Sequence, residues 1–180
     1  MHSLECAVWA GDGLLGVADG FGPSTETAMP SAAALNTLAT STASAGALLD
    51  ALRTAVEQAA DKVATMTTSD PALEGAGTTL TALAWSGAEL ALVHVGNSRA
   101  YLLCDGELLQ LSHDDALVQS LIDEGRLTSE EAESHPQRMI LIRAFARRRD
   151  HAAGRRRRVA GGPAGSQLAV PVGRSCGSRS

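Results

Sequence analysis

Three short segments of this chain place oxygen-bearing side chains beside residues that allow tight turns. Asp19-Gly20 ends one apolar run, Gly77-Thr78-Thr79 opens another, and Gly96-Asn97-Ser98-Arg99 follows a third. An isolated Asp-Gly is usually only a turn, but carboxylate, amide and backbone oxygens are also the ligands that hard divalent cations bind. Taken together, the segments place oxygen-bearing groups and tight turns at the ends of apolar runs.

An Asp-Gly turn between two apolar runs predicts the hairpin that positions Asp19. The runs are Cys6 to Trp9 and Leu14 to Ala18, and this pattern is typical of a β-hairpin. Apolar residues spaced three and four apart predict an amphipathic helix from Ala47 to Met66. The Ala/Leu-rich run from Thr25 to Thr40 predicts another helix.

The middle of the chain predicts an antiparallel meander. Short apolar runs alternate with turn residues at intervals of about ten residues, which is typical of consecutive antiparallel strands. Downstream, a helix is expected from Asp114 to Glu124, because Gly125 favours a helix end. Thr128-Ser129-Glu130-Glu131 fits a capping box, so a short helix is expected there, before Pro136. The meander strands are expected at Thr78 to Trp85, Leu90 to Val95, Ala100 to Leu103 and Leu108 to Leu111.

Charge divides the chain into an acidic body and a basic tail. The formal net charge is −5; residues 1–146 carry six Lys or Arg against nineteen Asp or Glu, and residues 147–180 carry nine Arg against one Asp. The tail is rich in Arg, Gly, Pro and Ser without periodicity, so we expect disorder there. It lacks interleaved aromatic residues, and we expect no nucleic-acid binding, although its charge alone could bind an anionic surface. The expected domains are residues 1–145 and a basic tail, residues 146–180, whose abrupt onset also fits an out-of-frame translation of a GC-rich gene.

Length, cysteines and hydropathy limit the function classes. The 180 residues suffice for one domain with a core. Cys6, Cys104 and Cys176 show no C-x-x-C spacing, so we expect free thiols in a reducing cytoplasm and no zinc knuckle. No stretch approaches the roughly 18 apolar residues of a membrane span, so a cytoplasmic protein without a membrane partner is expected.

In this order, the segments resemble the signature motifs of the PPM (type 2C) family of metal-dependent Ser/Thr protein phosphatases, bacterial type. Val17-Ala18-Asp19-Gly20 is similar to the family's V-A-D-G, and Gly77-Thr78-Thr79 to its G-T-T. Gly96-Asn97-Ser98-Arg99 is similar to G-D-S-R, with Asn97 where the family has Asp. Further similar segments are Leu111 to Val118, Glu130-Glu131-Ala132 and His135 to Phe145.

The resemblance implies an α+β fold, an α-β-β-α sandwich of two antiparallel sheets flanked by helices. Here the sandwich is expected to be incomplete at its C-terminal end, because the family's later S-D-G-L and D-N segments have no counterpart. Unpaired strand edges and exposed apolar faces should follow. The resemblance also implies that Asp114 caps the helix after it and that Arg99 is a structural anchor rather than a substrate clamp.

For function, the resemblance implies hydrolysis of phosphoserine and phosphothreonine in proteins by water activated on two Mn²⁺ or Mg²⁺ ions, opposite a Ser/Thr kinase. Asp19 matches the residue that bridges the two ions, Gly20 the residue whose carbonyl binds one of them, and Asn97 the Asp of a third, weaker site. The implied partners are phosphorylated proteins, together with a Ser/Thr kinase or its substrates.

Several residues depart from the family pattern and weaken the implied centre. Cys6 matches a carboxylate position, and a thiol is a poor partner for Mg²⁺ or Mn²⁺. Asn97 keeps an acceptor oxygen but lacks the charge. Phe21-Gly22-Pro23-Ser24 leaves no His where a general acid often stands, so we assign no catalytic residue. With Asp19 as the remaining carboxylate, we expect weak or no metal binding and no hydrolysis, as in a truncated pseudophosphatase. The alternative is a silent phosphatase-like module that binds partners, or a fragment without function.

Overall fold

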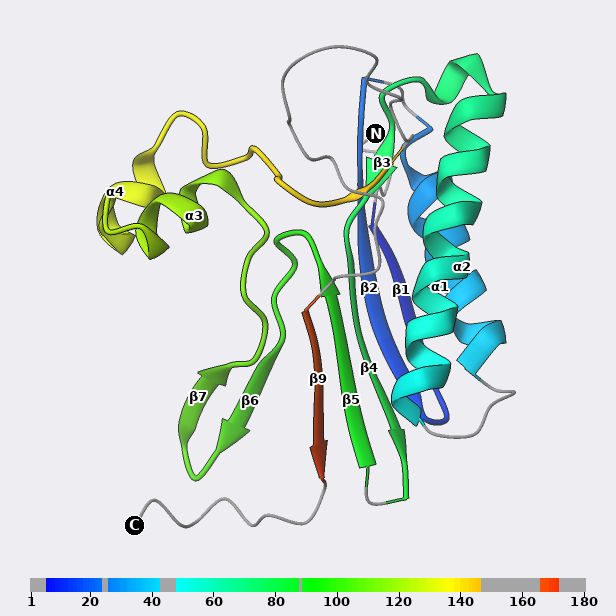
Figure 1. Ribbon diagram of the computed structural model, residues 1–180, viewed down its shortest axis with the longest axis horizontal. Helices are drawn as coiled ribbons and strands as arrows, with labels where there is room; N and C mark the ends of the chain where they lie inside the picture. Colours follow the sequence, from blue (N-terminus) through cyan, green and yellow to red (C-terminus); the bar gives the residue numbers. More distant parts are fainter. Residues whose placement is uncertain (1–5, 24–25, 43–47, 88, 147–165, 172–180) are drawn as a thin grey trace.

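A seven-stranded antiparallel sheet forms the body of the protein (Figure 1). The computed structural model describes residues 6–23, 26–42, 48–87, 89–146 and 166–171. The predicted hairpin is confirmed: strands β1 and β2 pair around the Asp12-Gly13 turn, where Gly13 has a φ of 80° that suits glycine. The strand order is β8-β3-β2-β4-β5-β9, with β1 on β2. The strands are β1 (Cys6–Gly11), β2 (Leu14–Phe21), β3 (Gly77–Thr78), β4 (Leu80–Ser86), β5 (Glu89–Val95), β8 (Phe145–Ala146) and β9 (Ser166–Pro171).

Two helices, α1 (Ala28–Thr42) and α2 (Leu48–Ser69), cover one face of this sheet (Figure 1). Both confirm the predicted helices within a few residues at each end. Their buried residues follow the spacing of one helix face, as the sequence pattern requires. A short 3-10 helix, η1 (Pro71–Leu73), leads back to the sheet. The core between helices and sheet includes Leu35, Leu38, Leu52, Val56, Val63, Leu80 and Val93.

The predicted meander divides into two sheets. Strands β4 and β5 belong to the large sheet, whereas β6 (Tyr101–Cys104) and β7 (Glu107–Gln110) form a separate two-stranded ribbon (Figure 1). The chain leaves the large sheet after β5 at Gly96, whose φ of 112° favours glycine. The ribbon's turn, Asp105-Gly106, has positive φ at both residues, as a tight hairpin requires.

Helix α3 (Leu117–Asp123) is shorter than predicted at its start. Asp114 does not cap it, so that expectation is wrong; the cap position is Ala116, which makes no side-chain bond. The reason is that the Asp114 carboxylate binds Arg99 instead. The helix ends before Gly125 (φ 69°), as expected.

Helix α4 (Ser129–Ser134) confirms the predicted capping box. The Thr128 hydroxyl accepts a bond from the Glu131 backbone N–H, and the Glu131 carboxylate accepts one from the Thr128 N–H. These bonds lower the pKa of Glu131. The α3–α4 unit lies apart from helices α1 and α2 (Figure 1).

Strand β9 corrects one expectation about the tail. Residues 166–171, assigned above to a disordered segment, pair with β5 in antiparallel register from Glu89↔Pro171 to His94↔Ser166. The free edge of β5 offers unpaired backbone groups, and a short extended segment can bind such an edge through its backbone alone. The rest of the expected tail lies outside the described residues.

The sheet face opposite the helices is only partly covered. Alternation along β1, β2 and β4 turns Val8, Leu15 and Trp85 to this face, where they are 71%, 45% and 38% exposed. The ribbon β6–β7 likewise exposes Leu103 and Leu108. The expected exposed apolar faces are therefore confirmed.

Two further expectations concern cysteines and membranes. Cys6 is a free, exposed thiol, as expected. Cys104 is disulfide-bonded, so the expectation of a free thiol is wrong there. Within the described residues, no helix has the length and apolar character to cross a bilayer.

Candidate metal site

The carboxylate of Asp19 lies near the end of β2 on a backbone held by the Gly77-Thr78-Thr79 segment. The Asp19 N–H donates to the Thr79 hydroxyl (3.1 Å), and its carbonyl accepts bonds from the Thr79 N–H (2.9 Å) and the Thr78 hydroxyl (3.2 Å). A Cβ on Gly77 would lie 2.6 Å from the Phe145 carbonyl oxygen, so glycine is required there. The segment thus has a structural role, because its hydrogen bonds hold the backbone of Asp19 in place.

The same threonine connects Asp19 to the Gly96-Asn97-Ser98-Arg99 turn. The hydroxyls of Thr79 and Ser98 lie 2.9 Å apart. A Cβ on Gly96 would come within 2.6 Å of the Thr79 side chain. Asn97, between these two contacts, is half-buried, and no hydrogen bond joins it to Asp19 among the residues that the structure describes. The three motifs therefore meet at Thr79.

A buried histidine supports this turn from β5. The Thr81 hydroxyl donates to the Ser98 carbonyl (2.7 Å), so its bond with His94 Nδ1 (2.9 Å) must use a proton on the ring. This assigns the proton to Nδ1, and Nε2 has no hydrogen-bond partner in the described part of the chain. Burial lowers the pKa of His94, and the nearby carboxylates of Asp115 and Asp114 oppose that effect.

Asp115 fixes the other side of the turn, a role that the sequence analysis missed. Its carboxylate accepts the Gly96 N–H (3.1 Å) and its own N–H donates to the Gly96 carbonyl (2.6 Å). Arg143 approaches the second carboxylate oxygen at 3.5 Å. Gly96 and Asp115 are 19 positions apart in the sequence, so no local sequence pattern indicates this contact. The available signal was the pair of adjacent acidic residues, Asp114 and Asp115, that follows a strand.

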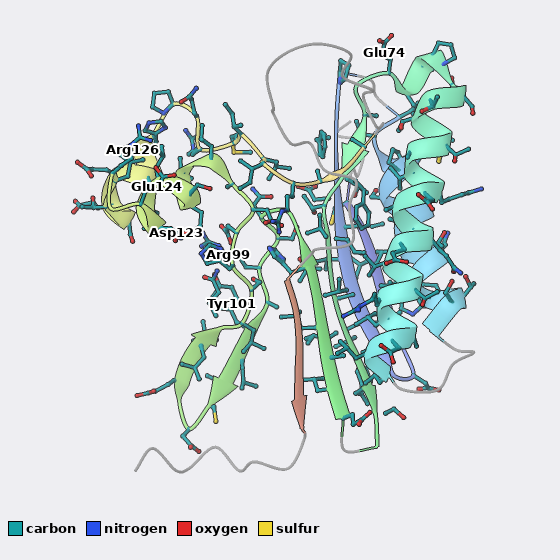
Figure 2. All side chains as sticks on the ribbon, viewed as in Figure 1. Glu74, Arg99, Tyr101, Asp123, Glu124 and Arg126 are labelled. Atoms are coloured by element: carbon teal, nitrogen blue, oxygen red, sulfur yellow. The ribbon has the colours of Figure 1, made fainter. Side chains whose placement is uncertain are left out.

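Arg99 is confirmed as a structural anchor. Its guanidinium donates to Asp114 from Nε (2.9 Å) and from Nη2 (2.7 Å). These charge-assisted bonds join the segment after β5 to the segment after β7. This bond, more than any other contact, raises the pKa of Arg99. Figure 2 shows Arg99 above Tyr101 and well away from helices α1 and α2.

Cys6 lies directly opposite Asp19 in the β1–β2 register. Directly opposite residues of an antiparallel pair project from the same sheet face, and both residues are exposed. Burial, and then the negative charge of Asp19, raise the pKa of the Cys6 thiol. The structure therefore places Cys6 beside the candidate cation ligand.

The described residues around Asp19 do not provide the oxygen ligands that a manganese pair needs. The exposed carboxylate of Asp19 receives no hydrogen bond from the described residues and is available to a cation. The residue directly opposite it in the hairpin is Cys6, whose thiol suits Mn²⁺ poorly. Nowhere in the described ranges do three or more His, Cys, Asp or Glu gather closely enough to hold a metal ion.

Comparison with known proteins gives one consistent group. The chain is 46% identical over 143 residues to the serine/threonine protein phosphatase PstP of Mycobacterium tuberculosis, covering 78% of this chain and 28% of that protein. It is 35% identical over 94 residues to the serine/threonine phosphatase stp of Listeria monocytogenes, covering 52% of this chain and 37% of that protein. The chain thus spans less than two fifths of these curated relatives. No family model matches it.

Solved structures agree with these relatives. The catalytic domain of PstP in complex with two manganese ions superposes with a TM-score of 0.77 at 35% identity, covering 95% of this chain and 67% of that one. The PPM Ser-Thr phosphatase MsPP from Mycobacterium smegmatis, in complex with cacodylate, gives a TM-score of 0.75 at 31% identity, covering 96% and 68%. Both the sheets and the helices described above therefore have counterparts in solved phosphatase domains.

Proposed function

This chain belongs to the PPM family of bacterial Ser/Thr protein phosphatases, and we therefore propose that it is a phosphatase-type domain that recognises phosphorylated Ser and Thr of proteins without hydrolysing them. Its relatives are Ser/Thr phosphatases, and the PstP catalytic domain binds manganese. The proposed partners are phosphoproteins, either a Ser/Thr kinase or its substrates.

The observation that carries the proposal is the pair formed by Cys6 and Asp19. In this family a pair of divalent cations supplies the activated water when bound. Here the position facing Asp19 carries a thiol instead of an oxygen ligand, and Asn97 brings an uncharged amide to the nearby turn. Both differences lower the negative charge available to hold hard dications.

The backbone around Asp19 is nevertheless intact. Thr79 accepts a hydrogen bond from the Asp19 N–H and donates one to the Asp19 carbonyl, and a hydrogen bond between the Thr79 and Ser98 hydroxyls connects Thr79 to the neighbouring turn. The architecture of a phosphatase surface can therefore persist where the charge needed for hydrolysis is reduced. This favours a binding module over a fragment without function.

The alternative is an active metal-dependent phosphatase. The observation in its favour is the exposed Asp19 carboxylate, which no described donor occupies. If it held manganese productively, Asn97 would serve as a weak additional oxygen ligand and Gly20 as a carbonyl donor. Activity would then depend wholly on Asp19.

An assay of p-nitrophenyl phosphate hydrolysis with Mn²⁺ distinguishes the proposed silent domain from an active phosphatase. We expect the full chain and its Asp19→Ala variant to give the same background rate, with the PstP catalytic domain as the positive control. Circular dichroism of both samples checks that the substitution leaves the fold intact. Turnover by the full chain that disappears in Asp19→Ala would establish the active enzyme instead.

Recognition needs a separate measurement. Fluorescence titration with a phosphothreonine peptide should show saturable binding that the unphosphorylated peptide lacks. Equal affinity for the two peptides would contradict the proposed phosphoprotein partner.

A further inference from the structure

Cys104 takes part in a disulfide, and the composition of the chain leaves one candidate for its partner. The chain has three cysteines, Cys6, Cys104 and Cys176. Cys6 is a free thiol and Cys104 is disulfide-bonded, so elimination within one chain leaves Cys176, which lies outside the described residues. We propose that a Cys104–Cys176 disulfide holds β9 on the edge of β5, and that a dithiol reductant releases β9 by opening this bond.

The ribbon β6–β7 fixes the position of Cys104. This residue ends β6, lies directly opposite Glu107 and precedes the tight Asp105-Gly106 turn. It is half-buried, so a small reductant can reach its sulfur. In the described part of the chain, the ribbon shares no strand pairing with the large sheet. A bond from Cys104 to the segment after β9 therefore connects two separate sheets.

The direction of β9 brings its end to the same side of the molecule as this turn. β9 runs antiparallel to β5, from Ser166 opposite His94 to Pro171 opposite Glu89. The turn of the ribbon and the end of β9 both point to the bottom of Figure 1. Cys176 follows Pro171 by five positions, and five residues span at most about 18 Å. A disulfide at Cys176 therefore keeps the end of β9 close to the ribbon.

Strand pairing alone attaches β9 at one edge only. Among the described strands, β9 pairs with β5 and with no other. The preceding described element, β8, pairs with β3 at the opposite edge of the sheet, so residues 147–165 connect the two edges. Closing so long a connection costs conformational entropy. A disulfide five residues beyond β9 restrains its other end and reduces the entropy that β9 gains on release.

The strand that β9 covers is buried on both faces. Alternate residues of β5 belong to the core under α1 and α2, and Leu92 and His94, on the other face, are 3% and 0% exposed. Strands buried on both faces are typical of a sheet interior. Release of β9 leaves one edge of β5 unpaired, and such an edge can bind an extended segment of another protein. The redox state of Cys104 thus decides whether this edge is covered.

The exchange is balanced by the dithiol. One thiolate of the reductant attacks the disulfide, the sulfur–sulfur bond between Cys104 and Cys176 breaks, and the second thiol closes a disulfide within the reductant. Two electrons and two protons pass to the protein sulfurs, which become thiols. A disulfide oxidant reverses the reaction.

Peptide mapping tests the pairing. The full chain is equilibrated with oxidised glutathione, alkylated without reduction and digested. Mass spectrometry should find the peptides of Cys104 and Cys176 as one linked species, and Cys6 outside it. Cys104 that is alkylated, joined to glutathione, or linked to Cys6 or to a second chain would overturn the proposal.

Hydrogen exchange of the full chain tests the release of β9. Dithiothreitol should raise the exchange rates of segments 89–95 and 166–171 at least about tenfold over the oxidised chain. Segment 14–17 of β2, inside the sheet, should keep its rate. Cys176→Ser should exchange like the reduced parent with or without reductant, whereas Cys6→Ser should respond as the parent does.

Two results of this exchange experiment would contradict the release of β9. Unchanged rates at 89–95 and 166–171 after reduction would mean that pairing alone holds the strand. Equal acceleration of every segment, 14–17 included, would mean that the disulfide stabilises the whole fold rather than β9. Neither result depends on manganese or on phosphopeptide binding, so the proposed function is tested separately.

Discussion

The two faces of the large sheet differ in how completely they are covered. On the helix face, Leu38 and Leu52 are almost fully buried against α1 and α2. On the opposite face, Val8 and Leu15 remain 71% and 45% exposed. Antiparallel sheets tolerate one solvated face, but that face is usually polar. The apolar character of this one therefore indicates that it is suited to contact with further protein.

The candidate site lies on the less covered face, and different interactions fix its geometry from those that stabilise the helix face. Asp19 and Cys6 are placed there by strand register, and Thr79 and Ser98 are placed by hydrogen bonds. The helix face is stabilised by apolar burial, which is non-directional. The opposite face obtains its geometry from directional polar contacts, which suits a binding position.

A matched pair of leucine truncations gives the largest expected effect. Leu38→Ala should lower the free energy of unfolding by about 3 kcal/mol, because it opens a cavity at a fully buried position. Leu15→Ala, on the exposed face, should cost at most about 1 kcal/mol. Urea denaturation followed by circular dichroism measures both. Equal losses would show that both faces are packed in solution and would remove the contrast.

Gly96→Ala should have the next largest effect, about 2 kcal/mol. The new Cβ would lie 2.6 Å from Thr79, and the φ of 112° is unfavourable for alanine. Gly106→Ala is the control, because its φ of 84° is also positive but its added Cβ meets nothing within 4 Å. The difference between the two variants in urea denaturation measures the close contact alone. Equal losses would contradict the tight packing of the turn on Thr79.

The two faces also differ in how far the sequence predicts them. The three- and four-residue spacing of apolar residues predicts α2, because one side of this helix is buried. The Asp12-Gly13 turn predicts the β1–β2 hairpin. That hairpin also fixes the pairing of Cys6 with Asp19. These features depend on neighbours in sequence or on one apolar face, so local patterns contain them.

Long-range polar contacts account for the failures. Where the chain leaves the large sheet before β6, Gly96 is bonded to Asp115, and Asp114, the expected cap of α3, is bonded to Arg99. Such pairs join residues 15 or 19 positions apart, and no helix or strand period indicates them. For the same reason the sequence analysis proposed Asp19 as a ligand but missed the Thr79–Ser98 contact that connects Asp19 to the turn.

A pH dependence should follow from His94, a buried titratable residue near the candidate site. Burial lowers its folded pKa below the unfolded value of about 6.5, so the unfolded chain gains a proton first as pH falls. The contribution of the neutral His94 ring to the free energy of unfolding is therefore complete above about pH 6.5. Below that pH it decreases by at most about 1.4 kcal/mol per pH unit, until the pH reaches the folded pKa.

Urea denaturation between about pH 7.5 and pH 5 measures this dependence. His94→Gln, which keeps a polar side chain without titrating, should flatten the profile in that window. Asp114 and Asp115 face His94 and favour its charged form, so their attraction limits the effect. An unchanged slope in His94→Gln would assign the dependence to other groups.

The smallest effect on stability is expected at the ribbon. Leu103 and Leu108 are directly opposite in β6 and β7 and are 70% and 64% exposed. Replacing both with Thr keeps good strand formers and should change the free energy of unfolding by only about 0.5 kcal/mol. Self-association, measured by sedimentation velocity, should decrease because an exposed apolar pair is removed. A loss above about 2 kcal/mol would mean that these leucines are buried in solution, and the ribbon would then belong with the packed face rather than with the open one.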